Sequence, residues 1–394
     1  MIEIKKEKDC CGCGACADIC PKKCINLLFN ENGFLFPKVD KNLCINCQLC
    51  NKVCPIYNVR KRRIKNEFYA GQNIDNKIRN RSTSGGIFYA VAKKILDDGG
   101  IVYGTALTDN ARSAEFRRID KIEELSALMG SKYIQSKTAN VFKLVKQDLN
   151  QEKTVLFVGT PCQVEGLKKY INTNFSNLYT MDLVCHGVAS QKVWAEYIKY
   201  HVKETNKKLI DVNFRSKIIG WNKGGSMQLL FDNDSIYYKD FREDLFGRAF
   251  NANLVFRSSC ENCCFKGFSR ISDITLGDFW GIKEFIKNFD DDLGTSLIIV
   301  HSEKGKEILK ALSSKLNVSR VKAYEAVKKN PFIVESIKPN KNKEDFFRKL
   351  GNEPFEELIE EYAMIEINLW RNLRRKVYRN LIRVWEQIDE YISS

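Results

Sequence analysis

The sequence predicts two fold classes in succession, α+β and then α/β: a small cysteine-rich module, a larger α/β core with a mixed sheet, and a C-terminal amphipathic helical tail. Three observations predict this order. Cysteines crowd the beginning of the chain in two identical runs, strand-like and helix-like segments alternate through its middle, and apolar residues recur at helical spacing near its end. We place the module at residues 1–60, the core at 66–345 and the tail at 346–394.

The N-terminal module is defined by one motif that occurs twice. Each copy spaces four cysteines as C-x2-C-x2-C-x3-C and ends in a proline, Pro21 in the first copy and Pro55 in the second. This pattern is typical of two 4Fe-4S clusters, and the fourth cysteine of each run ligates the other cluster. The predicted ligands are Cys10, Cys13, Cys16 and Cys54 for cluster 1, and Cys44, Cys47, Cys50 and Cys20 for cluster 2.

Zinc and disulfides explain this motif less well. Zinc sites use paired C-x2-C units rather than runs of four, and disulfides need an oxidising compartment. Residues 1–9 are charged and lack an apolar core, so we expect no secretory signal and a cytoplasmic location. Residues 5–58 resemble two-cluster ferredoxins, which implies a bacterial-type ferredoxin fold for the module.

Composition narrows the range of partners. The 394 residues include 15 cysteines and carry a formal net charge of +15. Each oxidised cluster with four thiolates would contribute about −2 and offset part of this excess. A basic surface suits acidic electron carriers, nucleic acid or anionic lipid, and a solvated lysine-rich face is the plain alternative. We expect no nucleic-acid partner, because no helix-turn-helix, RNA-binding or zinc-finger pattern occurs, and no membrane-spanning helix, because no apolar run is long enough.

The core begins after a basic linker at residues 60–65. Strand-like segments alternate with helix-like segments, which predicts a mostly parallel sheet covered by helices. A β-rich stretch then follows at residues 211–238, with a hairpin turn around residues 232–234. The predicted strands are 101–107, 155–158 and 178–184, and the predicted helices are 87–96, 141–149, one ending near residue 170 and one capped by Ser190.

Four cysteines in the predicted core are candidates for one ligand set. Cys162 and Cys185 each follow a predicted strand, at the edge where open α/β sheets hold their sites. Cys260 and Cys263 form a C-x2-C pair farther along the chain. The four thiols suit either a third 4Fe-4S cluster or a structural zinc ion, and counting does not separate these two.

Several core segments resemble, in the same order, the family formed by the beta subunits of coenzyme F-420 hydrogenase and dehydrogenase. Together with the module, the resemblance covers about residues 5–350. It implies an FAD in the α/β core, electron transfer between flavin and clusters, and a core cluster held by the four cysteines just described. The matching segments are residues 82–86, 130–136, 157–163, 182–187, 214–215, 220–221 and 260–281.

The resemblance also implies flavin contacts. Gly85 and Gly86 at a helix N-terminus would present backbone N–H groups to a pyrophosphate, although a serine–glycine turn is also an ordinary helix cap. Arg270 and Asp278 are further candidates, with an ion pair as the plain alternative. The full set of implied flavin contacts is Ser84, Gly85, Gly86, Ser131, Lys132, Tyr133, Gln135, Ser136, Arg270 and Asp278.

No catalytic residue is assigned, and Lys132 and His186 are the candidates. Lys132 could stabilise a reduced flavin or simply be solvated. His186 could relay a proton, hydrogen-bond near the ligand Cys185, or be a buried structural histidine. Three cysteines lie outside the ligand sets: Cys11 and Cys24 are interpreted as packing residues, and Cys264 could replace its neighbour as a ligand.

The tail combines apolar residues at helical spacing with many arginines over residues 364–392. Such a basic amphipathic helix suits an anionic membrane surface or a partner protein. A helix packed on its own domain has the same pattern.

These features predict an iron–sulfur flavoprotein oxidoreductase. Flavin would couple a one-electron carrier such as ferredoxin to two-electron chemistry on a small substrate or a soluble coenzyme, NAD(P)H or a deazaflavin. No G-x-G-x-x-G motif identifies nicotinamide. The alternatives are a non-catalytic electron-transfer subunit that docks a partner enzyme, and a structural zinc protein with a scaffolding tail.

Overall fold

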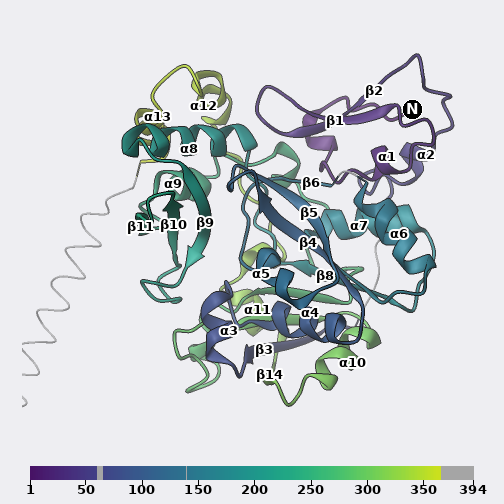
Figure 1. Cartoon of the computed structure of the whole chain (residues 1–394), viewed down its shortest axis with the longest axis vertical. Coiled ribbons are helices and arrows are strands. Elements are labelled where there is room, and N and C mark those ends of the chain that lie inside the picture. Colours follow the sequence, from purple (N-terminus) through teal and green to yellow (C-terminus); the bar gives the residue numbers. More distant parts are fainter. Residues whose placement is uncertain (60–64, 139, 365–394) are drawn as a thin grey trace, which may run out of the picture.

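The computed structural model describes residues 1–59, 65–138 and 140–364. The predicted linker falls almost entirely outside these residues, as does the predicted tail helix beyond residue 364. Figure 1 shows the N-terminal module beside the large α/β core. No helix in the described ranges is long and apolar enough to cross a membrane.

The module repeats one backbone conformation in its two cysteine runs. Gly12 and Gly14 take positive φ angles of 68° and 83° between the first three cysteines. Asn46 and Gln48 take the corresponding angles, 53° and 63°, in the second run. These left-handed residues tighten each loop and suit glycine or asparagine best. The module's elements are the 3-10 turn η1 (Glu7–Asp9), α1 (Ala15–Asp18), α2 (Leu49–Lys52), and the antiparallel strands β1 (Ile25–Phe29) and β2 (Leu35–Val39).

The core is built on a nine-stranded mixed sheet with the order β14-β3-β13-β12-β8-β7-β4-β5-β6. Only its four central strands, β12, β8, β7 and β4, are continuously parallel. The predicted mixed sheet is confirmed, whereas the expectation of a mostly parallel sheet was wrong for the flanks, where β13, β3, β14 and β5 pair antiparallel. The strands are β3 (Glu67–Asn73), β4 (Ile101–Thr108), β5 (Ser113–Ile119), β6 (Ser136–Lys137), β7 (Val155–Val158), β8 (Leu178–Leu183), β12 (Ile274–Asp278), β13 (Ser296–Val300) and β14 (Leu316–Val321).

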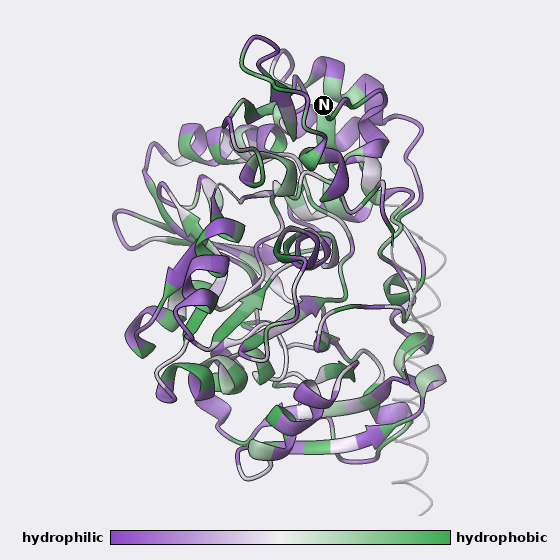
Figure 2. Cartoon of the chain, turned by 90° about the vertical axis from the view of Figure 1, so that its right-hand side faces the viewer, coloured by the Kyte–Doolittle hydropathy of each residue, from purple (hydrophilic) through white to green (hydrophobic). Residues whose placement is uncertain are grey.

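Helices cover both faces of this sheet because its central strands are apolar on both sides. Leu156 packs with residues of α4, α5 and α10, whereas its neighbour Phe157 packs with residues of α6 and α7 on the other face. Figure 2 shows the hydrophobic residues of these strands inside the molecule. The core helices are α3 (Asn76–Arg81), α4 (Ile87–Asp97), α5 (Leu125–Leu128), α6 (Val141–Asn150), α7 (Pro161–Ile171), α10 (Glu303–Ala311) and α11 (Ala323–Lys328).

A second hydrophobic cluster surrounds the helix α8 (Gln191–Thr205). As predicted, Ser190 caps this helix by accepting hydrogen bonds from the backbone N–H groups of Lys192 and Val193. Helices α12 and α13, part of the predicted tail, contribute buried residues to the same hydrophobic cluster, so the packing continues past residue 345. The other elements here are β9 (Leu209–Ser216), β10 (Ser226–Phe231), β11 (Ile236–Asp240), α9 (Leu245–Asn251), α12 (Lys343–Lys349) and α13 (Phe355–Tyr362).

The module docks on the core where α6 and α7 begin. Asp18 of α1 accepts hydrogen bonds from the backbone N–H groups of Asn140 (3.0 Å) and Phe142 (2.9 Å) and so caps α6. Burial raises the pKa of this carboxyl to about 6. The Thr138 hydroxyl donates to the carbonyl oxygen of Cys13 at 3.1 Å. The cysteine loop of the module therefore lies against the core.

Candidate functional site

Each predicted ligand set of the module lines one cavity. Cys10, Cys13, Cys16 and Cys54 line the first cavity together with apolar side chains such as Ile2. Cys20, Cys44, Cys47 and Cys50 line the second. The fourth cysteine of each run thus lies at the cavity of the other set, and the assignment of these cysteines as cluster ligands stays a prediction.

The surroundings of these cysteines fit iron–sulfur clusters. The backbone N–H of Gly12 donates to Cys10 Sγ at 3.4 Å, and that of Ile2 donates to Cys50 Sγ at 3.2 Å. Hydrogen bonds to ligand sulfurs are one of the means by which proteins tune clusters. Burial raises the pKa of the Cys16 thiol, and the nearby Cys10, Cys54 and Cys50 raise it further. Bound iron would compensate this crowding of thiolates.

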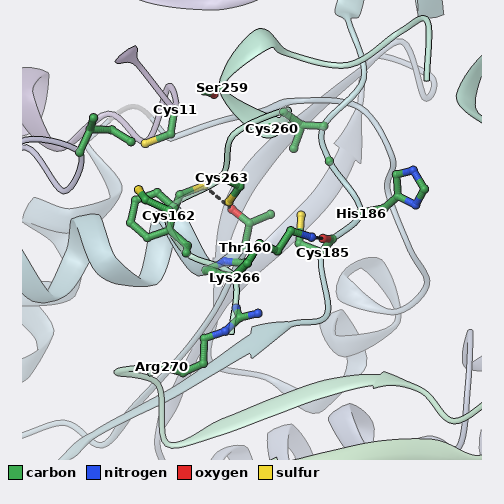
Figure 3. A pocket seen from close by; sticks show the side chains of 16 residues that line it. Cys11, Thr160, Cys162, Cys185, His186, Ser259, Cys260, Cys263, Lys266 and Arg270 are labelled. Atoms are coloured by element: carbon green, nitrogen blue, oxygen red, sulfur yellow. Dashed lines mark hydrogen bonds between the residues drawn. The ribbon is translucent and has the colours of Figure 1, made fainter. Parts of the chain in front are cut away.

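A third cavity lies in the core, and the four predicted core cysteines line it (Figure 3). Cys162 lies in the first turn of α7, directly after β7, and Cys185 follows β8. Because β7 and β8 are adjacent and parallel, both cysteines reach the same sheet edge. Cys260 ends the 3-10 turn η3 (Ser258–Cys260), and Cys263 follows in the next turn.

The four predicted ligand thiols of the core cavity are half-buried and crowd one another. Burial raises the pKa of Cys260 to about 12, with a further contribution from the charges of Cys162 and Cys263. Cys264 lines the same cavity but is exposed. In the described part of the chain, no three His, Cys, Asp or Glu side chains are grouped so as to hold a single metal ion.

Basic groups lie beside the core cavity. The Lys266 ammonium donates to the carbonyl oxygens of Cys185 (2.5 Å) and Phe332 (2.9 Å), and burial lowers its pKa. Arg270 also lines the cavity and forms a buried ion pair with Asp182 at 3.3 Å. The sequence pattern did not single out Lys266, although it lies three residues after Cys263.

His186 lines the same cavity, but its ring points away from the cysteines in Figure 3. Its Nε2 is 3.2 Å from the amide oxygen of Asn253, and its ring packs on Phe332 with centroids 3.9 Å apart. Burial lowers the pKa of His186 to about 4, so the ring is neutral near pH 7. These contacts fit the structural interpretation better than proton relay.

Two of the predicted flavin segments meet. The backbone N–H of Ser131 donates to Thr83 Oγ1 at 2.9 Å, which joins the 130–136 segment to the 82–86 turn. Lys132 donates to the carbonyl oxygens of Ala127 and Met129, and burial lowers its pKa to about 7. Lys132 is therefore engaged with the backbone of its own segment.

The serine–glycine turn packs on the start of β13. Ser84 Oγ donates to the Thr295 carbonyl oxygen at 2.8 Å, and the Gly85 N–H donates to Ser296 Oγ at 2.9 Å. The Gly85 N–H is thus occupied and not free for a pyrophosphate, contrary to expectation. Gly86 precedes α4 with a φ of 79°, and no side chain caps this helix.

Arg215 of β9 connects two predicted flavin residues. Its guanidinium donates to the Tyr133 hydroxyl at 3.0 Å and pairs with Asp278 at 3.3 Å. The same group lies over the ring of Trp280, 5.3 Å from its centroid. Trp280 stacks on the buried Trp221 with centroids 4.5 Å apart. We call Tyr133, Arg215, Trp221, Asp278 and Trp280 the arginine–tryptophan cluster.

A buried lysine links this cluster to the serine–glycine turn. Lys217 donates to the carbonyl oxygens of Arg79 (2.6 Å), Ser84 (2.8 Å) and Leu293 (2.5 Å), and burial lowers its pKa to about 7. Several buried donors nearby have no hydrogen-bond partner among the described residues: Arg79 Nε, Arg215 Nε, Trp221 Nε1 and Ser226 Oγ. Buried donors without acceptors are uncommon in proteins and suggest a missing ligand.

Comparison with known proteins reveals similarity to a known family. Residues 152–325 match the C terminus of the family described as "Coenzyme F420 hydrogenase/dehydrogenase, beta subunit". The match covers a little under half of the chain, which is similar to this family over those residues. It is 23% identical to the F subunit of the F(420)H(2) dehydrogenase of Methanosarcina mazei over 301 residues, which cover 70% of this chain and 77% of that protein.

Two further proteins are similar to this chain over different lengths. The coenzyme F420-dependent sulfite reductase of Methanocaldococcus jannaschii is 24% identical over 365 residues, 87% of this chain and 53% of that protein. The chain thus spans about half the length of that relative. A stretch of 54 residues, 14% of this chain, is 41% identical to an uncharacterized ferredoxin of the same organism and covers 68% of it.

The family match includes the core cavity and most of the arginine–tryptophan cluster, since residues 152–325 contain all four core cysteines and Arg215. Other predicted flavin contacts lie elsewhere. Gln135 accepts a hydrogen bond from the backbone N–H of Leu35 in the module (3.0 Å), and Ser136 accepts one from Gln163 of α7 (3.0 Å). Arg270 lies at the core cavity. The predicted set is therefore divided among three places in the core.

Proposed function

We propose that this protein is an iron–sulfur flavoprotein oxidoreductase that passes electrons between three 4Fe-4S clusters and an FAD. One observation carries the proposal: the twelve predicted ligand cysteines line three cavities, four of them at each, beside Cys11, Cys24 and Cys264. The module, residues 1–60, would hold two clusters and the core, residues 66–345, the third. Four thiolates for each cluster is the ligand set that 4Fe-4S clusters require.

The family supports the redox part of this proposal. Its relatives include a subunit of an F420H2 dehydrogenase, an F420-dependent sulfite reductase and a ferredoxin. An oxidoreductase role in iron–sulfur electron transfer follows from this kinship. Two of these relatives are named for coenzyme F420, which makes a deazaflavin the first soluble coenzyme to test, ahead of NAD(P)H.

The arginine–tryptophan cluster is the best candidate for holding FAD. Its unpartnered buried donors and the cations of Arg215 and Lys217 suit a polar, anionic group, and the uncapped start of α4 offers backbone N–H groups nearby. Asp278 ends β12, which lies beside β8 and parallel to it, so this cluster and Cys185 share one sheet edge. When bound, flavin exchanges electrons singly or in pairs. Arg215 would hold positive charge beside it, and Lys217, whose pKa burial lowers to about 7, would donate hydrogen bonds.

A non-catalytic electron-transfer subunit is the second candidate function. The relative from Methanosarcina mazei is itself named as a subunit of a larger dehydrogenase. In that case the chain would relay electrons to a partner enzyme, and the module would exchange them with ferredoxin or another carrier. Flavin content separates the two functions, because only the flavoenzyme needs FAD for two-electron chemistry.

The test is anaerobic purification with iron, sulfide, zinc and flavin quantified together. We expect about twelve iron atoms per chain, four for each cluster, and one FAD. Eight iron atoms with one zinc and no flavin would refute both the core cluster and the flavin. About twelve iron atoms without flavin would favour the second candidate function, a non-catalytic electron-transfer subunit.

Single cysteine variants assign the core ligands. We expect Cys263→Ser to lose about four iron atoms, because its cluster lacks a ligand. The matched control is Cys264→Ser, at an exposed neighbouring position, which should keep its iron. The reverse result would make Cys264 the ligand.

A further inference from the structure

The loop that carries Cys11 lies between two cavities that are lined by cysteines. Cys11 and Ile56 line both the cluster 1 cavity of the module and the core cavity. The Cys11 thiol is near enough to Cys13 on the module side and to Cys162 on the core side for both to shift its pKa. Cys11 belongs to neither predicted ligand set, yet it neighbours one ligand of each.

Helix α7 brings the same two sites together. Cys162 lies in its first turn, and Gly166 follows one turn later on the same face. A Cβ atom on Gly166 would lie 3.0 Å from Cys13 Sγ and 3.2 Å from Cys13 Cβ. Glycine inside a helix is unfavourable by about 0.5–1 kcal/mol relative to alanine. Here its lack of a side chain permits the close approach of the module's ligand loop.

Arg257 fixes this loop from the core side. The residue is 1% exposed, and its Nε donates to the Cys10 carbonyl oxygen at 2.7 Å. Its Nη1 donates to the Leu35 carbonyl oxygen at 2.9 Å, and the guanidinium lies 4.0 Å from the centroid of the Phe36 ring. Its Nη2 is buried without a partner among the described residues. A buried cation thus lies between the module loop and Cys260, three residues along the chain.

We propose that Cys11 is the relay contact through which electrons pass between cluster 1 and the core cluster, with Gly166 and Arg257 as its positioning residues. This inference rests on the proposed function. Electrons tunnel more efficiently through protein atoms than across gaps, and Cys11 places its side chain at the boundary between the two cavities that Cys13 and Cys162 line. With both clusters bound, one electron would pass from reduced cluster 1 to the oxidised core cluster. No bond forms or breaks and no proton moves, and the original reductant is a one-electron carrier of the ferredoxin class.

The test is Cys11→Ala in the full chain, with Cys24→Ala as the matched control. Cys24 also lies outside the ligand sets, but in the other half of the module, with its Sγ 3.4 Å from Cys20 Sγ. Iron is quantified first. Each protein is then mixed with reduced bacterial ferredoxin, and the module and core clusters are followed by rapid-freeze paramagnetic resonance. We expect Cys11→Ala to keep its iron and lose the fast phase of core-cluster reduction, and Cys24→Ala to keep both.

Two results would overturn the relay: wild-type core reduction in Cys11→Ala, or loss of about four iron atoms, which would make Cys11 a ligand. Gly166→Leu is a second variant that keeps every cysteine. Its side chain should push the module loop away and remove the same fast phase at full iron content. If the unmodified protein lacks the core cluster, the proposed function fails. Full iron with unchanged kinetics in both variants refutes only the relay.

Discussion

The buried ion pair of Arg270 and Asp182 offers a sharp test of how the core is held together. Its side chains are only 5% and 3% exposed, and the nearest N–O distance is 3.3 Å. Asp182 also accepts a hydrogen bond from Thr275, which ties β8 to β12. Arg270→Leu would leave a buried carboxylate without its cation, which costs about 3–5 kcal/mol. The destabilisation should fall on these two central strands.

Native-state hydrogen exchange measures this local cost, because it reports the opening of individual elements. Since 1.4 kcal/mol corresponds to a factor of ten, amides of β8 and β12 should exchange about 10²- to 10³-fold faster in Arg270→Leu at equal iron content. A double variant with Asp182→Leu should recover much of the loss, because no charge is left unpaired. The exposed pair Lys93–Asp97 is the control, and Lys93→Leu should cost about 0.5 kcal/mol or less. If the double variant loses as much stability as the Arg270→Leu and Asp182→Leu variants lose together, the reasoning is refuted.

Three further predictions follow from single contacts. Gly85→Ala should lower the free energy of unfolding by about 1–3 kcal/mol, since its Cβ would lie 2.3 Å from the Gly71 carbonyl oxygen; urea titration measures this. Burial lowers the pKa of His301 to about 4 from 6.5, so the unfolded state binds the extra proton and stability falls as the pH drops from 6.5 toward 4. At pH 5 the loss should be about 2 kcal/mol, and a His301→Asn variant that kept the same pH slope in urea titrations would contradict this. Arg215→Met should reduce bound FAD without changing iron content, as measured by flavin release and iron assay.

The sequence predicted best what depends on local spacing. The crossed sets of module cysteines follow from the two repeated runs, and Cys162 and Cys185 meet because parallel strands end at one edge. The flanking strands were harder to predict from the sequence, because a strand such as β14 carries polar and apolar residues without clear alternation. Gln135 was assigned to the flavin by resemblance, and only the docked module shows its contact with Leu35.

Buried cations could not be found from the sequence because the chain contains 64 lysines and arginines. Lys217, Arg257 and Lys266 become special only through the carbonyl groups that surround them in the fold. Cys11 was interpreted as a packing residue for the same reason. Its position between two cavities depends on how the module docks, and spacing within the module carries no information about that.

The distribution of charge around the cavities argues for a direction of electron flow. The core cavity is lined by Lys266 and Arg270, whereas the cluster 1 cavity is lined by Asp9 and by no lysine or arginine among the described residues. The buried Arg257 lies between the two sites and acts on both, so it does not separate them. Nearby positive charge stabilises the more negative, reduced form of a cluster. Because Asp182 already neutralises Arg270, Lys266 should account for most of the difference.

We therefore expect the core cluster to have the higher reduction potential and to accept electrons from the module. Lys266→Met should lower the potential of the core cluster toward that of cluster 1 and leave cluster 1 unchanged, as followed by paramagnetic resonance during a redox titration. Its matched control is Lys22→Met, beside the cluster 2 cavity, which should not shift the core cluster. A core potential below that of cluster 1 in the unmodified protein would reverse the direction: electrons would then leave through the module rather than enter by it.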